Sequence, residues 1–265
     1  MILNVSQLLI LNSKRVDVSG SPTATFKNDV ISEIVASTPT LVVERLISIT
    51  LMSGTTERDT VTFSSISISS ISESEKKVVI TASGSFTPGS SYTADRIRVK
   101  TVTGKVYFET SITPVSITAG VPTTVTWELT ITISRGSRSG WCAQAYDLLC
   151  VGDATTNRFL RALAVALTSD RTTSPVSPSL TITEFIAANM SMENMLTNMT
   201  LNKTYSDTTV TISASGIVRS GLTDYTFYSA ILREGRGSNN LFWWQFVNLN
   251  VQPNDVIQLS FSITI

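Results

Sequence analysis

The sequence predicts an all-β protein made of two tandem, duplicated antiparallel β-sandwich domains of Ig-like or jelly-roll topology, each preceded by a short amphipathic helix. Three observations lead to this fold class. Short segments alternate apolar residues with Ser or Thr, as strands with one buried face do. Gly and Pro turn signals separate these segments at short intervals. Similar blocks recur in the same order at a nearly constant offset, which indicates an internal repeat.

Four blocks carry the repeat. The apolar residues of an early helical segment, Phe26, Val30 and Ile34, recur as Phe159, Leu163 and Leu167, at an offset of 133. The strand-like segments 47–50, 79–84 and 130–133 recur as 180–183, 211–216 and 262–265, at offsets of 133, 132 and 132. Strands rich in Ser, Thr and Ile resemble one another readily by chance. The shared order, with a single one-residue slip, favours duplication instead.

Each copy is expected to contain one helix near its start. Residues 25–37 and 157–169 place apolar side chains on one helical face, and a proline follows each segment soon after its end. The segment 135–140, Arg-Gly-Ser-Arg-Ser-Gly, is a small polar connector between the copies. We therefore expect a first domain over residues 1–138 and a second over residues 139–265.

The remainder of each copy is predicted to form short strands. In the first copy these strands are expected at 61–68, 79–86, 96–100, 106–109, 112–117 and 125–133. Turn signals such as Ser53-Gly54 and Pro88-Gly89 separate them. Six or seven strands at this spacing are typical of a sandwich or a jelly roll, with the helix packed on an open end or edge.

The composition argues against several function classes. The chain has no histidine, so it lacks the commonest general base and metal ligand and cannot form a Ser-His-Asp or Cys-His site. We expect no enzymatic activity, no cofactor and no metal site. The 20 basic and 20 acidic residues cancel, so nucleic-acid binding is not expected. No apolar run is long enough to span a membrane, and the N-terminus lacks the basic region of a signal peptide.

Three segments of the first copy resemble a known kind of β-domain. They are 104–108 (Gly-Lys-Val-Tyr-Phe), 114–120 (Pro-Val-Ser-Ile-Thr-Ala-Gly) and 125–131 (Val-Thr-Trp-Glu-Leu-Thr-Ile). They resemble β-sandwich virion structural and tail-associated proteins of bacteriophages and archaeal viruses, and residues 157–163 are similar to the helix that often precedes this domain. The similarity is weaker in the second copy. It implies a homo-oligomeric tail, nozzle, fibre or capsid-surface component of a virion, with other virion proteins as partners and no catalytic residues.

Differences between the copies indicate an assembly surface. At an offset of 132, the basic residues Arg96, Arg98 and Lys100 are replaced by Tyr228, Ala230 and Leu232. A strand face that is solvated when basic is expected to be covered when it carries Tyr and Leu. The next strand, 241–247, is apolar on both faces, and large aromatic residues dominate interface energetics. We predict an intersubunit interface, or alternatively a thicker core or contact with the first domain, at Tyr228, Leu232, Phe242, Trp243, Trp244 and Phe246.

Two alternatives stay open in the sequence. Cys142 and Cys150 flank a short segment and form either a disulfide or two small buried hydrophobic residues. A second function class is an extracellular or cell-surface adhesion or carbohydrate-binding module, in which exposed Trp and Tyr stack on a host-surface glycan. A cell-surface or secreted scaffold is a third and would require a cleaved leader.

Overall fold

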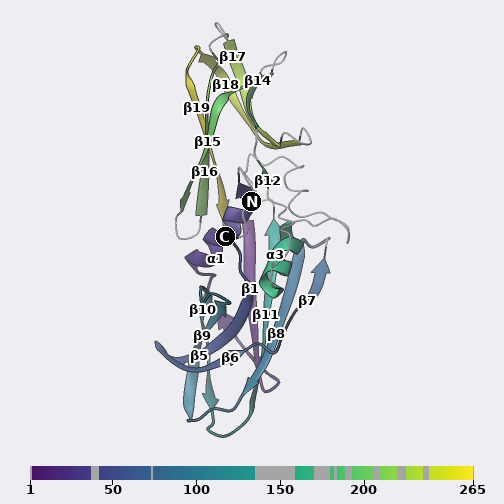
Figure 1. The fold of residues 1–265 in the computed structure, drawn as a ribbon, viewed down its shortest axis with the longest axis vertical. Helices are drawn as coiled ribbons and strands as arrows, with labels where there is room; N and C mark the ends of the chain where they lie inside the picture. Colours follow the sequence, from purple (N-terminus) through teal and green to yellow (C-terminus); the bar gives the residue numbers. More distant parts are fainter. Residues whose placement is uncertain are drawn as a thin grey trace.

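The structure is a computed structural model in which two β-sandwiches lie end to end along the long axis of the molecule (Figure 1). It describes residues 2–36, 42–72, 74–134, 159–169, 180–181, 184–188, 193–205, 209–219, 225–234 and 239–264. These residues form several antiparallel sheets, one two-stranded parallel sheet and two helices, so the predicted all-β fold class is confirmed.

The first half is a sandwich of two sheets. Its elements are β1 (Ile2–Leu11), β2 (Lys14–Val16), β3 (Val18–Ser19), α1 (Ala24–Ile34), β4 (Val35–Ala36), β5 (Leu46–Ser53), β6 (Thr56–Thr62), β7 (Ser65–Ser72), β8 (Lys77–Phe86), β9 (Tyr92–Thr101), β10 (Val106–Ile117) and β11 (Thr123–Ser134). One sheet has the order β1-β11-β8-β7 and the other β3-β10-β9-β5-β6. Because side chains alternate between the faces of a strand, Val125, Trp127 and Leu129 of β11 point into the core and the Thr and Glu residues between them point outward.

The second half repeats this strand order. Its elements are α3 (Phe159–Thr168), β12 (Leu180–Thr181), β13 (Glu184–Ala188), β14 (Glu193–Met195), β15 (Thr197–Tyr205), β16 (Thr209–Ile217), β17 (Tyr225–Glu234), β18 (Asn239–Val251) and β19 (Val256–Thr264). The order β18-β17-β13-β14 corresponds to β10-β9-β5-β6, and β19-β16-β15 corresponds to β11-β8-β7. A tandem repeat requires this correspondence, although the duplication itself stays a prediction.

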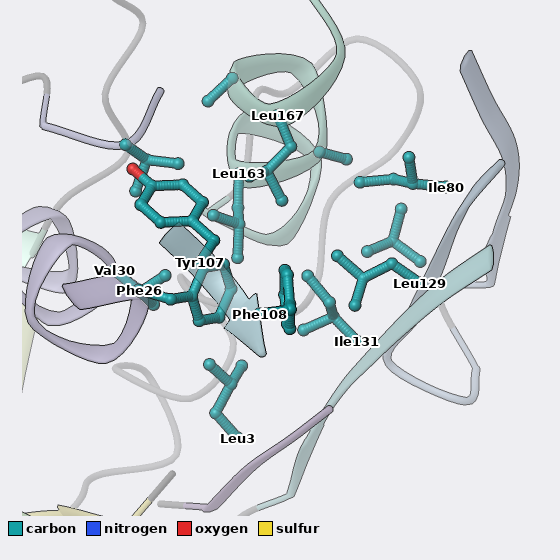
Figure 2. Packing of buried hydrophobic residues seen from close by; sticks show 14 of the residues in the cluster. Leu3, Phe26, Val30, Ile80, Tyr107, Phe108, Leu129, Ile131, Leu163 and Leu167 are labelled. Carbon is teal, nitrogen blue, oxygen red and sulfur yellow. The ribbon is translucent and has the colours of Figure 1, made fainter. Parts of the chain in front are cut away.

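Both helices pack into the first half (Figure 2). On α1, Phe26 and Val30 are fully buried, and the Phe26 ring meets Tyr107 edge-on with ring centroids 5.3 Å apart. Leu163 and Leu167 of α3 are also fully buried, and α3 packs against β7 and β8. The sequence predicts α3 as the opening helix of the second domain, whereas the structure places its apolar face in the core of the first half. An amphipathic pattern shows that a helix buries one face, but it does not show against which sheet.

Strand β1, which the sequence analysis did not predict, joins the halves. It pairs antiparallel with β11 over ten residue pairs, from Ile2 with Ser134 to Leu11 with Val125. Its first residue also pairs in parallel with Thr264 of β19. One sheet therefore runs β15-β16-β19-β1-β11-β8-β7 through both halves, and the N- and C-terminal ends lie close together near the middle of the molecule (Figure 1).

Candidate functional site: the outer face of the second half

The residues predicted to form an interface lie on the β17–β18 hairpin. By strand register, Ala230 pairs with Trp244, Ile231 with Trp243 and Leu232 with Phe242. A register shift separates these pairs from those at the open end of the hairpin, away from its turn. Tyr228 and Phe246 lie at that bulge. Of the six predicted interface residues, only Leu232 has a described side chain; the others are described by their backbone.

Leu232 does not lie on an outer surface. It is 0% exposed and belongs to the main hydrophobic core together with Ala230. The matching core residues of β9 are Val99 and Ile97, so the offset between the two strands is 133 rather than 132. A one-residue change of register moves every side chain to the opposite face of the sheet. The sequence comparison therefore matched Ala230 and Leu232 with the outward-facing basic residues of β9, and the structure corrects this assignment.

With the corrected register, an apolar row crosses the outer face of the four-stranded sheet. Met195, Ile186, Ile231 and Trp243 are successive direct partners on β14, β13, β17 and β18. Ile186 and Ile231 are 3% and 6% exposed and form a small cluster separate from the main core, whereas Met195 is 44% exposed. Because neighbouring strand positions alternate between faces, position 243 belongs to this outer row and position 244 to the inner face.

An ion pair crosses the row. Arg233 of β17 donates two hydrogen bonds to Glu193 of β14, with Nη1–Oε2 and Nη2–Oε1 distances of 2.9 and 2.8 Å. The strand partners of these two residues, Glu184 and Ala188, lie on β13 on either side of Ile186, so the pair crosses β13 diagonally above Ile186. Hydrogen bonding to Glu193 raises the pKa of Arg233 although partial burial opposes the charge. The ion pair therefore lies across the row at Ile186, between the exposed Met195 and the rest of the sheet face.

The corresponding face of the first half carries charges instead. Arg96, Arg98 and Lys100 line the outer face of β9, with side chains 37%, 24% and 26% exposed. Arg98 lies between two carboxylates, Glu57 on β6 and Glu109 on β10, with Nε of Arg98 2.9 Å from Oε2 of Glu109. The hydrogen bond from Lys100 is the main cause of the lowered pKa of Glu57. This face is a partly solvated ladder of ion pairs.

A second polar cluster lies where α1 meets the β9–β10 hairpin. Oδ2 of Asp29 accepts hydrogen bonds from Tyr107 Oη at 2.7 Å and from Lys105 Nζ at 2.9 Å. Oε1 of Glu44 lies 3.0 Å from the same Nζ, and the backbone N–H of Glu44 donates to Tyr107 Oη at 2.9 Å. The cluster joins α1, the segment before β5 and the start of β10.

The pKa shifts in this cluster follow from burial and hydrogen bonding. Burial alone would raise the pKa of Glu44, but hydrogen bonds from Thr101, Thr103 and Lys105 lower it on balance. Burial and the hydrogen bond to Asp29 raise the pKa of Tyr107, so its hydroxyl stays protonated. Burial opposes the charge of Lys105, yet hydrogen bonds to Asp29 and Glu44 raise its pKa. At neutral pH the cluster therefore holds an ammonium group and a Glu44 carboxylate.

Sequence reasoning did not identify the residues of this cluster. Asp29 and Lys105 are 76 positions apart and meet only because α1 packs beside β10, a contact that no spacing pattern signals. It also missed Ile186 and Met195, which lie on strands of only five and three residues. The predicted pair Cys142 and Cys150 lies outside the described residues.

The described residues offer no candidate metal site and no membrane-spanning helix. Within those ranges, no group of three or more Cys, Asp and Glu side chains is placed to hold a metal ion. Neither of the helices described is long and apolar enough to cross a membrane. Comparisons of the chain with protein-family models, with curated proteins and with solved structures gave no match. The functional assignment therefore depends on the residues of this chain.

Proposed function

We propose that the chain is a non-enzymatic structural protein of a virion, a tail, nozzle, fibre or capsid-surface component that assembles with further copies of itself and with other virion proteins. The observation that most directly supports assembly is the apolar row of Met195, Ile186, Ile231 and Trp243, on a face where the first half carries charges. The virion assignment is supported by the resemblance of residues 104–131 to viral structural proteins. The absence of histidine from the sequence favours a structural over a catalytic role.

The chemistry of the row suits a protein contact. Ile186 and Ile231 are already covered within the chain, so the contact surface is expected to come from Met195 and Trp243. Met adapts its shape to a partner, and Trp supplies a large area at low entropic cost. The Arg233–Glu193 pair that crosses the row adds charged groups next to these apolar residues, and interfaces commonly combine apolar with polar contacts.

The test is the native mass of the purified chain, measured by light scattering on a size-exclusion column. We expect a defined oligomer. Trp243→Ser should break it down to folded monomers, because position 243 lies on the outer face. Trp244→Ser is the matched comparison: position 244 lies opposite the buried Ala230, so this change should lower the stability of each chain by about 3 kcal/mol or more.

Other outcomes would count against the proposal. A well-folded monomer at high concentration would contradict the proposal that copies of the chain associate through this face. An oligomer that survives both Trp243→Ser and Met195→Ser would place the interface elsewhere. A monomer that binds a glycan array through Trp243 would favour the adhesion alternative, for which no described aromatic side chain gives support, since none of them is classed as exposed.

A further inference from the structure

One amine in the first half lies between two carboxylates from different segments of the chain. Nζ of Lys105, the residue before β10, is 2.9 Å from Oδ2 of Asp29 on α1 and 3.0 Å from Oε1 of Glu44. An amide bond between side chains needs three groups in contact, namely an amine, a carboxyl carbon and a third group that carries protons between them. Lys105, Asp29 and Glu44 supply these three groups.

The surroundings of Asp29 favour attack on its carboxyl carbon. Asp29 is 8% exposed, and the oxygen that faces Lys105 also accepts a hydrogen bond of 2.7 Å from the hydroxyl of the fully buried Tyr107. Phe26, on the same helix, packs against both Tyr107 and Phe108, and all three rings are fully buried. Two donors on one oxygen draw charge away from the carboxyl carbon and stabilise negative charge that develops on that oxygen. Fixed contacts also hold amine and carboxyl together, which raises their effective concentration.

We propose that Lys105 and Asp29 join in an intramolecular isopeptide bond, with Glu44 as the proton carrier. Glu44 takes a proton from the Lys105 ammonium, and the freed amine attacks Cγ of Asp29. The new N–C bond forms while one C–O bond of the carboxylate breaks, and that oxygen leaves as water with the two protons that the ammonium gives up. The positive charge of Lys105 and the negative charge of Asp29 disappear together. Glu44 returns to its starting state, and no oxidant or other reagent is needed.

The bond would fix α1 to the sandwich. It closes a covalent loop between residues 29 and 105, and a cross-link of this length stabilises a fold by restricting the unfolded chain, as a disulfide does. α1 carries Phe26 and Val30 into the core, so the bond would hold a core element in place. Unlike a disulfide, it would not depend on the redox state of the surroundings. The inference is independent of the proposed virion role.

The test is the intact mass of the purified full-length chain. We expect a mass about 18 Da below the sequence value, which corresponds to the loss of one water in a covalent modification. Peptide mapping should recover one peptide that contains both Asp29 and Lys105. Lys105→Arg keeps a cation beside both carboxylates but cannot form the amide, and Glu44→Gln keeps the shape of the side chain but cannot carry the proton. Both variants should show their full calculated mass and a lower melting temperature.

The chain contains its own comparison site. Nζ of Lys100 lies 2.9 Å from Oε1 of Glu57, the same separation, but the Glu57 side chain is 41% exposed against 11% for Asp29, and no second carboxylate among the described residues contacts that amine. Peptides that contain Lys100 and Glu57 should therefore be recovered unlinked. The proposal is overturned if the folded wild-type chain, with its fold checked by circular dichroism, has its full sequence mass. It is also overturned if Lys105→Arg shows the same mass loss, because the water would then have come from another site.

Discussion

The two halves of the molecule share a strand order and differ in what covers their sheets. In the first half, α1 and α3 fill one end of the core, and the outer face of β9 carries ion pairs. In the second half, the corresponding outer face carries an apolar row, and neither described helix makes more than minor contact with the strands. Strand order depends on alternation and turns, which both halves share. Coverage depends on individual side chains, and those differ between the halves.

Two corresponding positions show how much the outer faces of the two halves differ. At the corrected offset of 133, Arg98 on β9 corresponds to Ile231 on β17. Arg98 keeps a 24% exposed side chain between two carboxylates, whereas Ile231 is 6% exposed. A buried charge without a partner is strongly unfavourable. A sheet face is therefore stable either when its charges are solvated and form ion pairs or when it is apolar and shielded from water. Each half has adopted one of these two states.

The largest effect is expected from α3, because this helix shows which half depends on it. Leu163→Ala and Leu167→Ala each truncate a fully buried side chain in the first half and should lower the free energy of unfolding by about 2–5 kcal/mol. Hydrogen exchange measured peptide by peptide should show the loss of protection in β7 and β8. Val165→Ala, on the same helix but at a 39% exposed position, is the control and should change stability by about 0.5 kcal/mol or less. Lost protection in β16 and β17 alone would instead assign α3 to the second half.

An intermediate effect is expected at two equivalent glycines. A Cβ at Gly84 in β8 would lie 2.8 Å from the carbonyl oxygen of Thr62, and a Cβ at Gly216 in β16 would lie 2.8 Å from Cβ of Leu196. Gly84→Ala and Gly216→Ala should each cost about 1–3 kcal/mol in chemical denaturation, as overpacking does. Gly89→Ala is the control, because nothing lies within 4 Å of its Cβ position. If only one of the two changes is costly, the halves do not share this close approach.

The fold class could be predicted because it depends on local patterns. Alternation predicted β8, β9 and β11, but the two strands expected at 106–109 and 112–117 form the single strand β10, and the segment expected at 61–68 is divided between β6 and β7. Helical spacing placed helices near 25–37 and 157–169, close to Ala24–Ile34 and Phe159–Thr168. Strand β1 escaped detection because its run from Leu8 to Leu11 does not alternate. Leu8 and Ile10 lie half-buried on the outer face, where a polar residue would be expected.

The candidate sites could be predicted only in part. The aromatic hairpin was found from composition, but the sequence comparison carried the offset of 132 from β8 and β16 into the next strands, where the structure gives 133, and it therefore exchanged the inner and outer faces. The cluster of Asp29, Glu44 and Lys105 was not predictable, because its members come from three separate segments that only tertiary packing brings together. Local patterns determine strands, whereas sites formed between distant segments require the fold.

The smallest effect is expected at the charged face that only the first half has. Glu57 accepts a hydrogen bond from Lys100 Nζ at 2.9 Å, and its contacts with Lys100 and Arg98 lower its pKa. A carboxylate whose pKa falls on folding stabilises the folded state above its unfolded pKa, about 4.3, and this contribution is lost as the pH falls through the lower folded value. Glu57→Gln should therefore cost about 0.2–1 kcal/mol at neutral pH, the usual range for exposed ion pairs.

The pH dependence of the stability lost in Glu57→Gln distinguishes a contribution from the charge of Glu57 from a contribution from its packing. Free energies of unfolding measured from neutral pH down to about pH 3 should show the difference between wild type and Glu57→Gln shrinking below about pH 4, because the wild-type carboxylate then becomes neutral as well. High salt at neutral pH should shrink the difference too, since it screens partly exposed charges. A deficit that stays constant across pH and salt would mean that Glu57 contributes packing rather than charge. The contrast between an ionic face in one half and an apolar face in the other would then need a different physical basis.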